Sequence, residues 1–200
     1  MDKLLAICEK KYEPEKVELV KKAIDFAKKV HADQKRESGE PYYIHPEAVA
    51  LILTELQMDA DTVIAGLLHD TVEDTAVTLD EICEQFGKRV AELVAAESEN
   101  KREDKPAAST WKIRKEETIE HLKTAPKEVK MLTLGDKLSN IRSICRDYEA
   151  QGDALWQRFN QKDKNEHRWY YKSIADCLSD LCEYPAYKEY VFLAEKTFGE

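Results

Sequence analysis

Residues 69–74 read His-Asp-Thr-Val-Glu-Asp, a run in which four of the six side chains can bind a metal ion or move a proton. The run follows the apolar segment 63–68, which predicts a buried helix. Burying charged side chains is costly unless they are paired or bind a metal. The cluster is therefore expected to face a cation inside a cleft. A histidine combined with carboxylates suits a divalent metal such as manganese, iron or zinc.

The spacing within this run indicates where a metal would lie. Adjacent side chains such as His69 and Asp70 diverge by about 100° on an ideal helix, so both reach one ion more easily where a helix ends. The threonines that follow, including the helix cap Thr78, predict such an end. Glu73 lies one turn after His69 on the same helix face and is the first candidate for a base that deprotonates water. Asp74 could instead position that water.

Two distant residues have the same chemical character. His45 precedes Pro46, whose ring disfavours a helical conformation at the residue before it, so the His45 side chain can project from a helix start into a cleft. Asp136 lies among apolar residues, where a carboxylate needs a partner, and Asn140 follows one turn later. A helix-entry role for His45 and a structural salt bridge for Asp136 are the ordinary alternatives. Together with the 69–74 run, both residues are interpreted as metal ligands.

Apolar residues recur with helical periodicity over nearly the whole chain. Polar segments with glycine and proline predict loops at 34–45 and 97–110, and residues 149–164 are expected to be irregular or weakly helical. Helices are expected near residues 14–31, 46–56, 60–72, 78–94 with an interruption at Gly87, 111–122, 126–145, 170–181 and 187–198. The chain is thus predicted to be all-α, a single domain over residues 1–200 built as a bundle of roughly eight to ten helices.

The composition limits the classes of partner. The net charge is −9, which argues against broad binding to nucleic acid or to an anionic membrane but allows a small anionic ligand in a local basic pocket. The five cysteines are scattered without a Cys-x-x-Cys pair, which favours a reducing compartment over a disulfide framework. The sequence has no signal-peptide pattern and no run of roughly 20 apolar residues, so a cytoplasmic protein is expected.

Three segments taken together resemble a known family. They are residues 36–46, Arg-Glu-Ser-Gly-Glu-Pro-Tyr-Tyr-Ile-His-Pro, residues 67–74, Leu-Leu-His-Asp-Thr-Val-Glu-Asp, and residues 135–142, Gly-Asp-Lys-Leu-Ser-Asn-Ile-Arg. In this order and spacing they resemble the HD-domain phosphohydrolases, and among these the hydrolase domain of the RelA/SpoT alarmone enzymes. The resemblance covers residues 17–147 well. A 200-residue chain without a synthetase domain is similar to a stand-alone small alarmone hydrolase.

The resemblance implies a fold, a metal site and a reaction. The fold would be the HD-domain helical bundle. The implied ligands of one metal ion, usually manganese in this family, are His45, His69, Asp70 and Asp136. Glu73 and Asp74 match the catalytic acidic pair of the family. The implied reaction is hydrolysis of the 3′-pyrophosphate of ppGpp or pppGpp, which gives GDP or GTP and pyrophosphate.

Such a substrate carries many negative charges, so cations are expected around it. The Arg36 guanidinium can stack on a base or bind a phosphate through two hydrogen bonds. The resemblance implies that the matching arginine lies against the base and that the residue matching Asn140 contacts the nucleotide. A basic run at 112–115 could bind pyrophosphate or could form a solvated helix face. The expected substrate contacts are Arg36, Ser38, Lys112, Arg114, Lys115 and Asn140.

Two positions depart from the family pattern near the expected nucleotide cleft. Residues 94–101 read Val-Ala-Ala-Glu-Ser-Glu-Asn-Lys where family members usually carry a Val-Thr-Lys-Leu type segment, and Glu37 stands where a basic residue is common. Guanine preference is therefore open, with an adenine alarmone, NADPH or another phosphorylated nucleotide as alternatives. A non-catalytic nucleotide-binding protein is the alternative of another class, and it would have no need of Glu73 and Asp74.

The remaining histidines and tryptophans have ordinary interpretations. His31 completes an apolar helical stripe and is interpreted as structural. His121 and His167 lie among charged residues and are expected at the surface. The tryptophans expected to pack, rather than to stack on a base, are Trp111, Trp156 and Trp169.

Overall fold

A computed structural model describes residues 2–36, 38–102 and 104–199 of the chain. The regular elements of these residues are eleven α-helices and two 3₁₀ helices, and one isolated β-bridge lies in a loop. The predicted all-α class is confirmed. Glu37, one of the two departures from the family pattern, lies outside the described residues.

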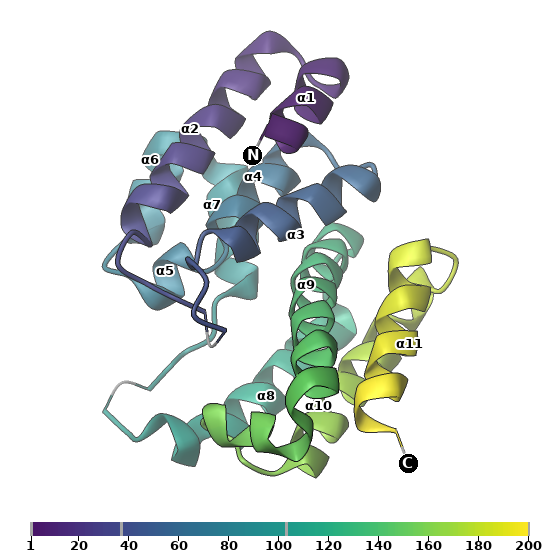
Figure 1. The fold of residues 1–200 in the computed structure, drawn as a ribbon. Helices are drawn as coiled ribbons and strands as arrows, with labels where there is room; N and C mark the ends of the chain where they lie inside the picture. The colour runs from purple at the N-terminus through teal and green to yellow at the C-terminus, as the bar shows by residue number, and fades with distance from the viewer. Residues whose placement is uncertain (1, 37, 103, 200) are drawn as a thin grey trace.

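The helices follow one another along the chain as Figure 1 shows. Their bounds are α1 (Asp2–Lys11), α2 (Pro14–Val30), α3 (Ile44–Glu55), α4 (Ala60–Leu68), α5 (Thr71–Asp74), α6 (Leu79–Phe86), α7 (Lys88–Glu97), α8 (Ala107–Thr124), α9 (Lys127–Gln151), η1 (Gly152–Arg158), α10 (Lys164–Cys177), η2 (Ser179–Leu181) and α11 (Pro185–Phe198). Side chains cap three of the starts: Asp59, Thr78 and Asp163 each accept a backbone N–H of the first turn that follows.

The helix expected over residues 60–72 is divided in two. Helix α4 ends at Leu68, and the one-turn helix α5 begins at Thr71. His69 and Asp70 lie in the turn between them, where the sequence predicts a helix end. Helix α1 was not expected from the charged N-terminal segment, and its buried Leu4 joins it to the core.

Helix α3 packs against α4 and α9, and these three helices position the residues of interest. Helix α4 also packs against α2 and α7, while the long helix α9 runs beside α11. In Figure 1, α8 and α10 lie below this group, at the opposite end of the molecule from α1. The buried apolar side chains form one cluster drawn from α1 through α11, as a single domain requires. The extent of the domain stays a prediction.

Two glycines let α4 and α9 approach α3 closely. A Cβ atom added at Gly135 would lie 3.3 Å from Cδ2 of Leu53, and one added at Gly66 would overlap Cδ1 of the same leucine. Leu53 is fully buried, so its side chain has little room to move. Gly66 lies one turn before His69, and Gly135 precedes Asp136. The close approach therefore brings His69 and Asp136 toward the start of α3.

One expectation about the surface is wrong. His167 is buried, and its ring centroid lies 5.5 Å from that of Trp111 and 5.2 Å from that of Trp156. Its charged sequence neighbours occupy the other faces of α10, so its local composition was misleading. Trp111 and Trp156 are buried as expected, and His121 is exposed. Among the described helices, none has the length and hydropathy that crossing a bilayer requires.

Replacing Gly66 with alanine is expected to destabilise the fold. The new methyl group would overlap Leu53, and overpacking a tight core costs about 1–3 kcal/mol. Urea unfolding measures this change. In a Leu53→Ala background the same substitution should cost much less, because the overlapping methyl is gone. An equal cost in both backgrounds would contradict the close-approach argument.

Candidate metal centre

Three segments distant in sequence bring four ionisable side chains together. His45 lies in the first turn of α3, His69 and Asp70 in the turn after α4, and Asp136 within α9. His45 Nε2 lies 3.0 Å from Asp136 Oδ1 and 3.6 Å from Asp70 Oδ2. His69 Nε2 lies 3.1 Å from Asp70 Oδ2 and 3.6 Å from Asp136 Oδ1. Both imidazoles therefore point the same nitrogen at the same two carboxylates.

The chemistry of these four groups fits a divalent cation. His69 Nδ1 lies 2.9 Å from the backbone oxygen of Gly66, which can only accept, so Nδ1 carries a proton. In the neutral ring, Nε2 then presents a lone pair. It is buried without a hydrogen-bond partner among the described residues, and it faces carboxylate oxygens. A nitrogen lone pair that faces two negative carboxylates is stable only when a proton or a cation lies between them. Imidazole nitrogens and carboxylate oxygens are also the atoms that bind divalent metals in proteins.

Burial and the neighbouring charges act in opposite directions on these groups. Burial lowers the pKa of His69, but the carboxylates of Asp70 and Asp136 raise it more. Burial raises the pKa of Asp136, but Lys137 and the two histidines hold it well below its usual range. Asp136 Oδ2 lies 2.6 Å from Lys137 Nζ, while Oδ1 faces the histidines. The salt bridge expected as the ordinary alternative is thus present and leaves the other oxygen for the cluster.

Glu73 and Asp74 lie on α5, directly after the His69–Asp70 turn. Glu73 Oε2 accepts the backbone N–H of Glu99 at 3.1 Å. Burial, followed by repulsion from Glu99 and Asp70, raises the pKa of Glu73 to about 7. Lys101 pairs with the Asp74 carboxylate and lies 3.9 Å from that of Glu73. A carboxylate that titrates near neutrality is suited to accept and release a proton at physiological pH.

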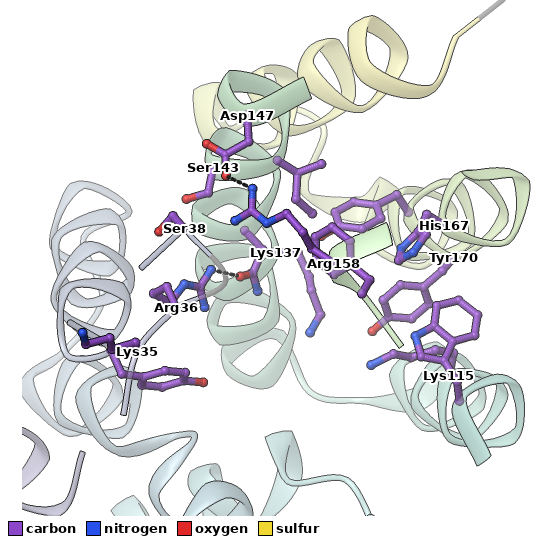
Figure 2. Close-up of a pocket in the computed structure, with 16 residues that line it drawn as sticks. Lys35, Arg36, Ser38, Lys115, Lys137, Ser143, Asp147, Arg158, His167 and Tyr170 are labelled. Atoms are coloured by element: carbon purple, nitrogen blue, oxygen red, sulfur yellow. Dashed lines mark hydrogen bonds and ion pairs between the residues drawn. The ribbon is translucent and has the colours of Figure 1, made fainter. Parts of the chain in front are cut away.

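The acidic and histidine residues described so far line one cavity of about 160 Å³, which we call the metal cavity. They are His45, His69, Asp70, Glu73, Asp74 and Asp136. A second cavity, of about 330 Å³, adjoins it, and the two share Arg36, Tyr42, Lys115, Lys137 and Asn140. Figure 2 shows this second cavity, with Arg36 and Ser38 on one side and Lys115 and Tyr170 on the other. Its basic residues are Lys35, Arg36, Lys115, Lys137 and Arg158, and its aromatic residues are Tyr42, Trp111, Phe159, His167, Tyr170 and Tyr171. The metal cavity therefore adjoins a basic cavity with aromatic walls.

Comparison with protein families matches residues 23–163 to the HD domain. The chain belongs to the HD-domain family. It is 44% identical over 134 residues to guanosine-3′,5′-bis(diphosphate) 3′-pyrophosphohydrolase of Aquifex aeolicus, covering 66% of this chain and 18% of that protein. It is 41% identical over 140 residues to a probable enzyme of the same name from Mycoplasma pneumoniae, covering 67% and 19%. The chain spans less than a fifth of either relative.

Two solved structures share the fold of this HD domain. A crystal structure of a Listeria monocytogenes protein, lmo0812, superposes with a TM-score of 0.69 at 35% identity, covering 81% of this chain and 98% of that one. A metazoan orthologue of SpoT, described as hydrolysing ppGpp, superposes with a TM-score of 0.74 at 23% identity. That match covers 94% of this chain and 99% of the metazoan one, and at this identity it supports the fold alone.

The HD domain brings four of the six expected substrate contacts to the second cavity. These four are Arg36, Ser38, Lys115 and Asn140. Across the cleft, Arg36 Nη2 donates to Asn140 Oδ1 at 2.8 Å, as the dashed line in Figure 2 marks. This bond joins the loop before α3 to α9 and holds both side chains at the wall of the second cavity.

Lys112 and Arg114 line neither of these two cavities, and their expected contact with pyrophosphate stays a prediction. Lys112 pairs with Glu166 at 2.5 Å and lies 3.3 Å from the centre of the Trp169 ring. Arg114 pairs with Glu99 at 2.9 Å and lines a different hollow. Successive residues on α8 point about 100° apart, so a basic run in sequence is not a basic cluster in space. Of this run, Lys115 alone lines the two cavities.

Other site residues were not predicted from the sequence. Tyr42 and Lys137 stand inside the three matching segments but had no assigned role, although each neighbours an assigned residue in space. Arg158 lies on η1, within the region expected to be irregular, and no local pattern marks it. The departure at 94–101 places Glu97 in the metal cavity, where burial raises its pKa to about 7.

Removing one imidazole is expected to remove most metal binding from this HD domain. With Mn²⁺ at a hundred times its Kd, the wild type should gain about 2.7 kcal/mol of stability. His69→Ala should lose most of this gain, because two carboxylates and one histidine bind the ion more weakly. Metal-dependent thermal unfolding and metal content measure the effect. His121→Ala, at an exposed position, provides the control. An equal increase in stability on adding Mn²⁺ in the two variants would contradict the assignment.

Proposed function

We propose that the chain is a metal-dependent phosphohydrolase that removes the 3′-pyrophosphate of ppGpp or pppGpp, giving GDP or GTP and pyrophosphate. The observation that carries the proposal is the contact between the two cavities. The imidazole–carboxylate cluster and two further acids adjoin a basic, aromatic-walled cavity that suits a phosphorylated nucleotide. The names of the Aquifex and Mycoplasma relatives support the choice of alarmone.

The residues that would hold the metal are His45, His69, Asp70 and Asp136, and we propose Mn²⁺ as the native ion. When bound there, a divalent ion lowers the pKa of a water ligand and polarises a phosphoryl oxygen. The protein supplies the orientation: the backbone oxygen of Gly66 fixes the tautomer of His69, and Ser139 lies 2.9 Å from Nδ1 of His45. Such outer contacts direct ligand nitrogens toward the ion.

Glu73 is the proposed general base. Its carboxylate is close enough to the cluster for Asp70 to affect its pKa, and it shares the cavity with the ligands. It takes a proton from the water that attacks the phosphorus bonded to the 3′ oxygen. The bond between this phosphorus and the 3′ oxygen breaks, pyrophosphate leaves, and the 3′ oxygen takes up a proton to become the hydroxyl of GDP or GTP. Asp74, held by Tyr42 and Lys101, orients the water. The pair therefore divides proton transfer and positioning between two adjacent carboxylates.

The cavity beside the cluster accounts for nucleotide binding in this proposal. Arg36 would stack on the base or bind a phosphate, and Asn140 would contact the nucleotide. Lys115 and Lys137 line both cavities, so they can meet the pyrophosphate as it approaches the ion. Arg158 lies in the second cavity only and would meet a phosphate at the 5′ end. The partner is thus a small nucleotide, and we propose cytoplasmic action without nucleic acid or membrane.

Product identification tests the function directly. Metal-loaded protein incubated with ppGpp should release pyrophosphate and GDP, resolved by ion-exchange chromatography. A panel with an adenine alarmone and NADPH tests base preference, because the departure from the family pattern at residues 94–101 places Glu97 and Glu99 in the metal cavity. Orthophosphate release, faster turnover of another panel member, or binding without product would each overturn the guanosine 3′-pyrophosphatase assignment.

Glu73→Gln is expected to lower turnover by at least about 100-fold, the usual range for a general base. Metal content should stay unchanged, because Glu73 is not among the proposed ligands. Steady-state kinetics with metal analysis measures both quantities. Glu84→Gln, at an exposed position of α6, provides the matched control. Turnover close to that of the wild type would remove Glu73 from the mechanism.

The pH dependence follows from the same carboxylate. The base must be ionised, and its pKa is raised to about 7, so the rate should rise with pH and level off above neutrality. A bound cation stabilises the ionised form and shifts this limb to lower pH. Initial rates between pH 5 and 9, which spans about two units on either side, measure the profile. A rate that falls as pH rises through 7 would contradict the assignment.

A further inference from the structure

His31 and Gln34, at the end of α2, lie behind the proposed catalytic pair. His31 Nδ1 lies 2.6 Å from Gln34 Oε1, and Gln34 Nε2 donates to the backbone oxygen of Asp74 at 2.7 Å. The His31 ring also packs on Tyr42, with centroids 4.7 Å apart and planes 30° apart. His31 therefore contacts two residues that each bond to Asp74.

The direction of these bonds determines the tautomer of His31. The backbone oxygen of Asp74 can only accept, so the Gln34 amide nitrogen faces it and the Gln34 oxygen faces His31. His31 Nδ1 must then donate, and it carries a proton. His31 is 1% exposed, and its Nε2 has no hydrogen-bond partner in the described part of the chain. The ring is thus held by one donated bond and one ring contact.

Tyr42 bonds to the other end of Asp74. Its hydroxyl lies 2.8 Å from Asp74 Oδ2 and 2.7 Å from Asp70 Oδ2. A phenol has one proton to donate, so Tyr42 links the proposed ligand Asp70 to Asp74 by a shared donor. Asp74 is consequently held at its carboxylate by Tyr42 and at its backbone by Gln34.

A purely structural role does not explain this arrangement. His31 continues the apolar stripe of α2, and an aliphatic side chain there would avoid burying an unsatisfied nitrogen, which costs about 1–3 kcal/mol. Helix α5 has only four residues, too few to be stable by itself. Its orientation therefore depends on bonds from neighbouring elements, and those from Gln34 and Tyr42 end on Asp74.

We propose that His31, Gln34 and Tyr42 are positioning residues for Asp74, and we call these three the Asp74 support. The inference rests on the proposed function, in which Asp74 orients the attacking water. His31 acts through the other two: it holds the Gln34 amide in the orientation that donates to Asp74 and holds the Tyr42 ring in place. The support fixes where the carboxylate points; His31 and Gln34 line neither cavity, whereas Tyr42 lines both.

Gln34→Met, Tyr42→Phe and His31→Phe test the support in metal-loaded protein. Each is expected to lower kcat by about 10-fold or more, the usual effect of losing an outer contact, with KM within about twofold. Gln34→Met should leave Mn²⁺ affinity unchanged, whereas Tyr42→Phe should weaken it because its hydroxyl also bonds to Asp70. Gln85→Met and Tyr12→Phe remove a comparable amide and hydroxyl bond far from the site and should leave kcat unchanged.

His31→Phe keeps a ring beside Tyr42 and removes only the bond to Gln34, so its effect on kcat should not add to that of Gln34→Met. The double variant should be about as slow as the slower single variant. A purely structural role predicts lower unfolding stability with unchanged kcat in the folded fraction, and that result would overturn the inference. Additive losses of kcat would also overturn the role given to His31.

A substrate-free measurement separates failure of this inference from failure of the proposed function. In hydrogen exchange, the peptide containing residues 71–75 should be less protected in Gln34→Met than in the wild type or Gln85→Met. Unchanged protection would overturn the support even if the wild type hydrolyses ppGpp. Reduced protection together with an inactive wild type would leave the support standing and reject the proposed reaction.

Discussion

Two imidazole nitrogens lie within 3.6 Å of the oxygens of two carboxylates at a largely buried place, and this arrangement constrains the rest of the structure. Charges in such a place are stable only with a compensating cation or proton. The surroundings supply partial compensation: Lys137 binds the outer oxygen of Asp136, and Lys101 binds Asp74. A single ion between the two nitrogens would balance what remains. These side chains therefore lower the stability of the folded state until a cation or proton is bound between them.

The fold meets this constraint through close helix packing. Leu53 of α3 lies against Gly66 of α4 and Gly135 of α9, and because neither glycine adds a side chain to the contact, both helices pack closely on α3. One turn beyond Gly66 lies His69, and next to Gly135 lies Asp136. The contact of Leu53 with the two glycines and the position of the histidine–aspartate cluster therefore depend on the same helix packing. A change that separates α3 from α4 or α9 would move His69 or Asp136 and would also remove core contacts.

The sequence was sufficient to predict the parts of the site that have local signals. His45 and His69 belong to short segments with clear chemistry, and helical periodicity predicts the all-α class. It was harder to predict which face of a helix a residue lies on and which distant segments pack together. Lys112 and Lys115 look equivalent in the sequence, but the turn of α8 directs them to different surroundings. Arg158 reaches the cavity because η1 folds back beside α9, and no pattern within η1 contains that information.

The two cavities draw on different parts of the chain. Every residue of the metal cavity precedes position 141, whereas eight of the residues that line the larger cavity, from Ser143 to Tyr171, follow it. In the proposed function, the metal cavity would carry out the reaction and the larger cavity would select the nucleotide. Substitutions in the later segment would then change the shape of the larger cavity for a different base or sugar and leave the groups proposed for hydrolysis in place. On this proposal, a change of substrate requires no change in the histidine and acidic residues.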